Sequence, residues 1–302
     1  MKRTLVVGSA CADLSLYIDH LPGIEEDIEP DYMCMSLGGC AANCANLLRI
    51  LDVPFTLLAP IGTGIYGNFV KEKLAALHME SAIKSSEENG VCVCLVDKKG
   101  NRSFLSHHGT EYVFYPEYFS TIDGDIYDFI YISGFELEEK TGDTIVQFLE
   151  ENPGKEIFFA IGPCYSAIPK DRIQRIWNLH PILHLNRKEA CVILKNPSLS
   201  LEDCAKGIQE QTHNICIVTD GANGTAYTDG PHVLFEPAFP VEAVDGTGAG
   251  DAHIGTVIAM LQKGKSLSDA IRIANYVGAI TTQSRSAMPD ETTVRKLCMT
   301  YE

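Results

Sequence analysis

Residues 245–251 read Asp245-Gly246-Thr247-Gly248-Ala249-Gly250-Asp251, with three glycines in seven positions. Glycine destabilises both helix interiors and strands, so this stretch predicts a turn. The mostly apolar residues 252–262 that follow predict a helix. A glycine-rich turn that leads into a helix presents unpaired backbone N–H groups and the positive end of the helix dipole. Both favour binding of an anion such as phosphate.

Asp251 lies beside this predicted anion site, where bound phosphate would repel its charge. One interpretation is a general base that takes a proton from a hydroxyl attacking the phosphate. The other is a helix-capping carboxylate, because acidic residues are common in a first helical turn. This stretch alone leaves both interpretations open.

Composition limits the partners that the chain can have. Its 302 residues include 24 Lys and Arg against 40 Asp and Glu, a formal net charge of −16. Such an acidic surface argues against nucleic acid or an anionic membrane as partner. The 11 cysteines include no pair with C-x-x-C spacing, and most lie among apolar residues. We expect a reducing, cytoplasmic location, with no disulfide framework and no zinc site.

The chain alternates between apolar strands and helices. Strands are expected at 4–8, 55–61, 127–132, 156–161, 182–185 and 215–219, and helices at 41–51, 65–78, 141–150, 171–177 and 267–282. This order predicts an α/β fold in which a mostly parallel sheet lies between two helical layers. Ligands bind beyond the carboxyl ends of strands in such sheets. Gly8, Glu136, Gly162 and Asn186 lie at these ends.

Two early segments, 14–37 and 91–106, have alternating polar and apolar residues instead of continuous apolar runs. Alternation predicts strands with one exposed face. The acidic residues 19–31 between the first strands predict a loop, and residues 97–101 predict a hairpin turn. The two segments are therefore expected to form a small separate sheet.

Two further glycine motifs precede predicted helices. Gly38 and Gly39 would let a ligand approach the backbone, with Asn43 in the first helical turn, although an ordinary glycine loop is the alternative. Residues 62–67 read Gly-Thr-Gly-Ile-Tyr-Gly, which is formally a dinucleotide-binding G-x-G-x-x-G pattern. That pattern is weak here, because it does not follow the first strand and no strand-end acid follows about 20 residues later.

These motifs, in this order, resemble the ribokinase-like (PfkB) family of carbohydrate and nucleoside kinases. Gly38-Gly39-x-x-x-Asn43 is similar to its first signature, and residues 245–251 are similar to its second. Asn186-x-x-Glu189 resembles the family's metal-associated motif, and Thr219-x-Gly221 its nucleotide loop. The resemblance implies a single three-layer α/β/α kinase domain over 1–302 with a small β-sheet lid from the two early segments.

The resemblance also implies a set of site residues. Asp251 would be the general base, and the backbone N–H groups of Gly248, Ala249 and Gly250 would bind the transferred phosphoryl group. The acceptor would contact Asp13, Gly38, Gly39, Asn43 and, from its strand end, Glu136. ATP would contact Asn186, Thr219, Gly221, Gly246, Gly248 and Asn275. Glu189 would bind Mg²⁺ through water.

Some positions depart from the family pattern. Gly64 replaces a frequent acid, and His253 replaces an aromatic residue, with a hydrogen-bonded helix histidine as the favoured interpretation. Many members hold a monovalent cation such as K⁺ between 245–247 and a late loop. Here Ser286 replaces the usual glycine, which argues against K⁺ activation.

The resemblance leaves the acceptor open between a sugar, a nucleoside and a phosphorylated sugar. Arg102 is a candidate to contact a sugar phosphate, and Tyr17 and Phe104 to stack on a base. His107 and His108 are expected on the lid surface, or in contact with the acceptor. A homodimer through the lid is also compatible with the resemblance. The alternatives to a kinase are a non-catalytic sugar- or nucleotide-binding regulator and, from residues 62–67, a nicotinamide oxidoreductase.

Overall fold

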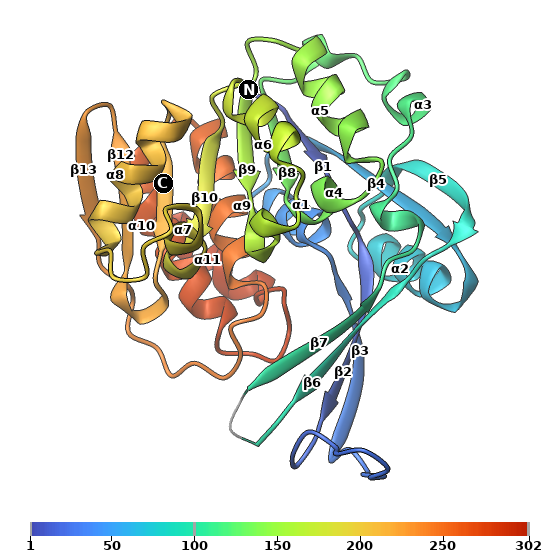
Figure 1. Cartoon of the computed structure of the whole chain (residues 1–302). Helices are drawn as coiled ribbons and strands as arrows, with labels where there is room; N and C mark the ends of the chain where they lie inside the picture. Colours follow the sequence, from blue (N-terminus) through green and yellow to red (C-terminus); the bar gives the residue numbers. More distant parts are fainter. Residues whose placement is uncertain (1, 99–100, 301–302) are drawn as a thin grey trace.

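The computed structural model of the protein describes residues 2–98 and 101–300 (Figure 1). Within these residues, the main sheet has nine strands in the order β13-β12-β11-β10-β9-β8-β1-β4-β5. All neighbours are parallel except β12, which runs antiparallel to both β11 and β13. The mostly parallel α/β fold expected from the sequence is therefore confirmed.

The main-sheet strands are β1 (Thr4–Val7), β4 (Phe55–Thr63), β5 (Ser81–Glu88), β8 (Phe129–Ser133), β9 (Glu156–Ala160), β10 (Ile182–Asn186), β11 (Cys216–Thr219), β12 (Thr225–Asp229) and β13 (His232–Glu236). The helices are α1 (Cys40–Ile50), α2 (Gly64–Ala76), α3 (Pro116–Phe119), α4 (Phe135–Glu138), α5 (Gly142–Glu151), α6 (Lys170–Trp177), α7 (Arg187–Ile193), α8 (Leu201–Thr212), α9 (Ala249–Gln262), α10 (Leu267–Thr281) and α11 (Glu291–Thr300).

Strand β1 lies at the centre and explains the two helical layers. Its side chains alternate between faces, so Val6 joins one buried cluster while Leu5 and Val7 join the other. Helices α1, α2, α9, α10 and α11 contribute to the first cluster, and α5, α6, α7 and α8 to the second (Figure 1). A central strand buried on both faces is mostly apolar, which is why Leu5-Val6-Val7 forms a continuous apolar run after Thr4.

A second sheet, which we call the lid, extends away from the helical layers (Figure 1). Its four strands, all within the described residues, run in the order β3-β2-β6-β7. They are β2 (Cys11–Tyr17), β3 (Tyr32–Gly38), β6 (Val91–Val96) and β7 (Arg102–His107). The strands lie within or beside the two segments in which alternation predicted them, and residues 19–31 form the expected loop.

Several elements differ from the sequence-based expectation. β5, β13, α8 and α11 were not predicted. The residues of β5, β13 and α11 are largely polar or partly exposed and leave a weak periodic pattern. Helix α8, by contrast, does have a buried face at helical spacing, formed by Leu201, Cys204, Ala205 and Ile208, so its sequence carried a helical signal. Helix α9 begins at Ala249, three residues before the expected start. A first helical turn needs no intrahelical partner for its N–H groups, so Gly250 costs little there. The turn predicted at 97–101 includes residues 99 and 100, which lie outside the described residues.

Candidate active site

The glycine stretch 245–251 forms the start of α9. Gly248 is the residue before the helix and has a φ of 75°, a left-handed conformation that favours glycine. A Cβ atom there would also overlap the backbone carbonyl of Ala287, in the late loop 284–288. By contrast, a Cβ at Gly246 or Gly250 would meet no protein atom within 4 Å. The glycines therefore fix a sharp turn at one position and leave free space at two others.

Asp251, in the first turn of α9, faces the first turn of α1. Its Oδ2 accepts a hydrogen bond of 2.9 Å from Asn43 Nδ2, although the two residues are 208 positions apart. The Cys40 thiol also hydrogen-bonds this carboxylate. Burial raises the pKa of Asp251 to about 6, the two hydrogen bonds oppose the rise, and the charge of Glu136 adds to it. A carboxylate with this pKa can gain and lose a proton near neutral pH.

The loop before α1 brings Asp13 into the same region. The Asp13 carboxylate lies so close to Gly38 that a Cβ there would overlap it. A Cβ at Gly39, whose φ is 93°, would lie 2.5 Å from the carbonyl oxygen of Ser9. Burial raises the pKa of the Asp13 carboxyl to about 6. A hydrogen bond from Cys11 opposes this rise, and the charge of Asp251 adds to it. The structure thus brings together two predicted site carboxylates from opposite ends of the chain.

Asn43 adds an acceptor to this region. It is 5% exposed, and its Oδ1 has no hydrogen-bond partner among the described residues. A buried polar atom without a partner costs free energy and needs an explanation. A ligand hydroxyl that donates a hydrogen bond to Asn43 Oδ1 would remove that cost.

Glu136 lies at the end of β8 but is only 1% exposed. Its Oε1 accepts a 2.7 Å hydrogen bond from the Ser9 backbone N–H, and its Oε2 accepts one from the Ser133 hydroxyl. Burial raises the pKa of this carboxyl, and the hydrogen bonds oppose that change. These contacts link the ends of β1 and β8, and an acceptor contact by Glu136 stays a prediction.

A pocket of about 540 Å³ lies on the other side of the α9 N-terminus. It contains five predicted nucleotide or phosphoryl contacts, namely Thr219, Gly221, Ala249, Gly250 and Asn275. Much of its remaining lining is apolar: Ala222, Phe239, Pro240, Val241 and Ala279. A mostly apolar cavity with a few polar groups is typical of a small-molecule site and fits a flat aromatic base. The residues at 220–224 form both the β11–β12 hairpin turn and one wall of this pocket.

A buried chain of hydrogen bonds forms another wall. Asn275 Nδ2 donates to two backbone carbonyls near the end of β13, so its Oδ1 is the acceptor for Thr225 and for His253 Nε2 at 3.0 Å. His253 Nδ1 must then accept from His184 Nε2, at 2.9 Å. Burial lowers the pKa of His253 to about 4 and that of His184 well below its usual range. His253 is therefore a neutral, hydrogen-bonded helix histidine, the interpretation that the sequence favoured.

Asn186 and Glu189 form the capping box of α7. Asn186 Nδ2 donates to Glu189 Oε1 at 2.7 Å, and the Asn186 backbone N–H donates to Glu189 Oε2 at 2.9 Å. Burial raises the pKa of Glu189, and the charge of Asp251 raises it further, so the two carboxylates influence each other. Each Glu189 oxygen keeps a second lone pair, which suits a water bound to a metal ion. The predicted metal role of Glu189 is compatible with this cap and stays a prediction.

The glycines at 62–67 are occupied by contacts within the protein. The Gly62 N–H donates to Asn89 Oδ1 at 2.7 Å. A Cβ at Gly62 would overlap the Glu87 carbonyl, and one at Gly67 would lie 2.6 Å from the Gly62 oxygen. These glycines allow close packing of β4, α2 and the segment after β5, which gives no support to a dinucleotide site there.

The lid contacts the glycine stretch through Arg102. Its Nη2 lies 2.5 Å from Asp245 Oδ1, and the two side chains are 21% and 9% exposed. Asp245 Oδ1 also accepts a 2.7 Å hydrogen bond from the Thr247 backbone N–H. A second contact places the Arg285 guanidinium 4.7 Å from the centre of the Tyr17 ring. The lid is thus joined to both the anion loop and the late loop.

Several contacts of this site could not be predicted from local sequence patterns. The Arg102–Asp245 pair joins residues 143 positions apart by number, and local patterns carry no information on such a pair. Phe239 and Val241 line the pocket from an irregular segment that periodicity does not describe. Their apolar character next to residues 245–251 was the one available hint.

A mostly parallel α/β sheet with a glycine-rich helix start, an apolar pocket and two buried carboxylates is compatible with a phosphotransferase. The model of the pfkB family of carbohydrate kinases matches residues 1–293. The chain is 32% identical over 281 residues to the uncharacterized sugar kinase YegV of Escherichia coli K12, covering 92% of this chain and 88% of that protein.

Solved structures agree with this match. Ribokinase from Thermotoga maritima superposes with a TM-score of 0.83 at 22% identity, covering 99% of each chain. Arabidopsis thaliana ribokinase, solved with ribose and ATP, superposes with a TM-score of 0.78 at 20% identity, covering 98% of each chain. The chain belongs to the pfkB family of carbohydrate kinases and is a sugar kinase.

Proposed function

We propose that this protein transfers the γ-phosphoryl group of ATP to a hydroxyl of an unphosphorylated sugar or nucleoside, with Asp251 as the general base. The observation that carries the proposal is the position of Asp251. It is hydrogen-bonded to Asn43 on the acceptor side and directly follows Gly250, where the backbone borders free space. A base that takes the hydroxyl proton must lie between the acceptor and the transferred group.

On the acceptor side, Asp13 and Asn43 would bind hydroxyl groups. The Asp13 carboxylate accepts hydrogen bonds, and the unpaired Asn43 Oδ1 offers another acceptor. Asp251 would take the proton from the attacking hydroxyl, which its raised pKa of about 6 permits near neutral pH. Gly38 and Gly39 keep the backbone close to Asp13 without side-chain bulk.

On the nucleotide side, the N–H groups at 248–250 would stabilise the negative charge of the transferred group. The apolar pocket fits adenine, and the free space at Gly246 and Gly250 fits phosphate oxygens. Asn186 and Glu189 would hold water bound to Mg²⁺. ATP would supply the phosphoryl group, and its bound Mg²⁺ would neutralise part of the phosphate charge. ATP bound to a ribokinase of the same fold supports this assignment.

Two features of the lid bear on the finer predictions. Arg102 is paired with Asp245, so its charge is engaged away from an acceptor phosphate, which favours an unphosphorylated acceptor. The same pair places a positive charge on the segment where a monovalent cation was considered, which supports activity without K⁺. The lid also exposes Tyr32, Met33 and Leu105, at 51%, 59% and 63%, which supports a homodimer through the lid.

A turnover assay tests the proposed function. Purified protein is incubated with Mg²⁺-ATP and a panel of sugars, nucleosides and sugar phosphates, and both ADP and the phosphorylated product are measured. We expect product from at least one unphosphorylated acceptor. Acceptor-dependent melting shifts without any product across the panel would instead favour a non-catalytic binding protein. Product from sugar phosphates alone would contradict the acceptor class.

The pKa values of the two carboxylates predict the pH dependence of catalysis. Asp251 and Asp13 titrate near 6 in the folded protein, above the ordinary value of 3.8, because burial disfavours their charged forms. The base must be deprotonated, so kcat/KM should be highest above pH 7 and fall as the pH decreases through about 6. If kcat/KM instead falls only near pH 4, the result would contradict the burial and the charge interaction assigned to Asp251 and Asp13.

Arg102→Ala tests the contact between the lid and the anion loop. The change leaves the mostly buried Asp245 carboxylate without its ion pair and loosens the lid. We expect kcat/KM for the acceptor to fall about tenfold, or ~1.4 kcal/mol. ATP hydrolysis without acceptor should rise relative to transfer, because an open lid admits water. Arg295→Ala, which breaks an exposed pair with Glu291, is the matched control and should change neither rate.

A further inference from the structure

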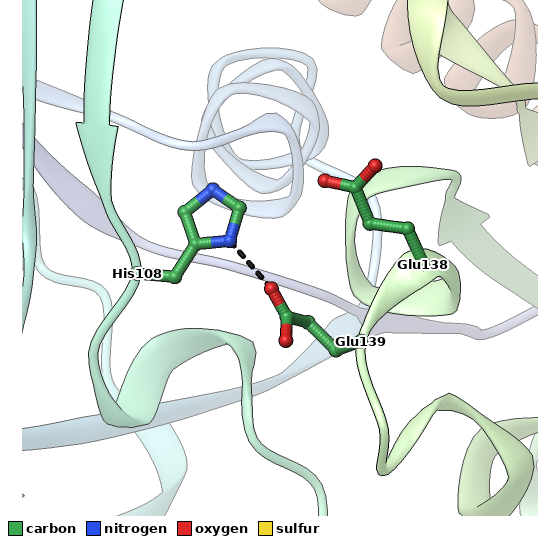
Figure 2. Close-up of side chains that lie close together, drawn as sticks. All are labelled: His108, Glu138 and Glu139. Atoms are coloured by element: carbon green, nitrogen blue, oxygen red, sulfur yellow. Dashed lines mark hydrogen bonds and ion pairs between the residues drawn. The ribbon is translucent and has the colours of Figure 1, made fainter. Parts of the chain in front are cut away.

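Three metal-ligating side chains meet outside the residues proposed for catalysis. His108, Glu138 and Glu139 each offer one ligand atom, and these atoms all lie within 4.8 Å of one another. Figure 2 shows the imidazole and the two carboxylates reaching into the same space. His108 directly follows β7, at the base of the lid, whereas the two glutamates end α4 beyond β8. The cluster thus joins the lid to the main sheet.

The three side chains are held in place by neighbouring contacts. The His108 ring stacks on Tyr112 with the ring centres 4.0 Å apart, and its Nδ1 lies 2.5 Å from Glu139 Oε1. Arg172, only 4% exposed, donates from Nη1 to the backbone carbonyls of Leu137 and Glu139. The ligand-bearing backbone and ring are therefore fixed without a metal ion, which lowers the cost of binding one.

The electrostatic surroundings favour a cation. The side chains of His108 and Glu139 are 26% and 30% exposed, so solvent screens them only in part. The ligand oxygens of Glu138 and Glu139 lie within 4.8 Å of each other, so their negative charges would repel when both carboxylates are ionised. The Cys164 thiol, whose own pKa is raised by burial, hydrogen-bonds Glu138 and helps to orient it. A divalent ion would offset both carboxylate charges at once.

We propose that His108, Glu138 and Glu139 form a binding site for a divalent first-row transition metal ion of the Mn²⁺ or Zn²⁺ kind. One imidazole nitrogen with two carboxylate oxygens suits these ions, whereas Mg²⁺ prefers oxygen ligands alone. With metal–ligand bonds of about 2.1 Å, two ligands on opposite sides of an ion are about 4.2 Å apart. The three ligand atoms, which all lie within 4.8 Å of one another, are therefore close enough together to share one ion.

Binding of Mn²⁺ to the full-length protein tests the site without nucleotide or acceptor. Chelator-treated protein is titrated with Mn²⁺, and free Mn²⁺ is followed by electron paramagnetic resonance. We expect affinity to fall at least about tenfold in His108→Ala and in Glu138→Gln. His107→Ala, an exposed neighbour, and Glu189→Gln, at the proposed Mg²⁺ site, are the controls and should keep the wild-type affinity at this site. Zn²⁺ is only the second probe, because cysteine thiolates outside the cluster can also bind it.

The outcomes separate this site from the proposed kinase activity, because no turnover is measured. Absence of Mn²⁺ and Zn²⁺ binding at millimolar concentration, or equal affinity in wild type and both cluster variants, would overturn the proposal. Loss of binding in His107→Ala to the same extent would also overturn it. Equal melting temperatures of Glu138→Gln and wild type in metal-free buffer show that the variant is folded. A melting temperature that Mn²⁺ raises in wild type and in both controls, but not in the two cluster variants, is the supporting result.

Discussion

Asp251→Asn should lower kcat for phosphoryl transfer by about 10²–10⁴-fold while the protein stays folded and binds nucleotide. The amide keeps the shape of the carboxylate, and its oxygen can still accept the hydrogen bond from Asn43. What it lacks is the ability to take a proton. Single-turnover transfer and ATP binding, measured on the same preparation, separate the chemical step from binding.

The stability of this variant supplies an internal control. The pKa of Asp251 is raised in the folded protein, so folding favours the neutral form of this carboxyl. The contribution of the neutral form to the free energy of unfolding is fully present below the unfolded pKa of about 3.8. It is lost as the pH rises through the folded pKa of about 6. A neutral asparagine removes that penalty, so the variant at pH 8 should melt no lower than wild type. Wild-type turnover in Asp251→Asn would show that Asp251 is only a helix cap.

Gly250→Ala and Gly248→Ala should both abolish most activity, but for different reasons. At Gly250 a methyl group meets no protein atom within 4 Å and fills the space proposed for phosphate. Loss of anion stabilisation of this kind typically costs about 10²–10³-fold in rate. Alanine also favours a helix over glycine, by up to about 1 kcal/mol. Gly250→Ala should therefore keep or raise the melting temperature while activity falls at least about 10²-fold.

At Gly248 the same substitution acts on the fold. The left-handed backbone costs alanine about 1–2 kcal/mol, and the added Cβ would overlap the Ala287 carbonyl. We expect a melting temperature several degrees lower together with loss of activity. Thermal denaturation and kcat/KM for ATP, measured on both variants, check the pair. Full activity in Gly250→Ala would mean that the free space at this glycine is not where phosphate binds.

The central elements and the pairing of distant motifs could be predicted from sequence because glycine motifs and apolar strands carry local signals. Gly38, Gly39 and residues 245–251 indicated places where a ligand can approach the backbone. The structure brings the helices that follow them together, with Asn43 Nδ2 2.9 Å from Asp251 Oδ2. The order of strands and helices was enough to place both motifs at one edge of a parallel sheet.

Contacts between polar residues with no local pattern could not be predicted. Arg102 carries no sign of its partner Asp245, and His108 was expected on the lid surface although its ring is held by Glu139 and Tyr112. β5 and β13 were missed because edge strands are partly solvated and leave weaker apolar patterns than β1. Such features depend on tertiary neighbours, which the sequence does not list.

Helix α9 has a consequence for how this chain folds during synthesis. It packs against Leu47 of α1, which itself lies on β1, yet it begins only at residue 249. Until that segment leaves the ribosome, the apolar side of α1 that faces α9 lacks its cover, and exposed apolar surface of this kind promotes aggregation. The elements that precede α9 must therefore wait for its synthesis before their core closes. The same late segment brings the proposed base, so closure of the core and assembly of the active site occur together.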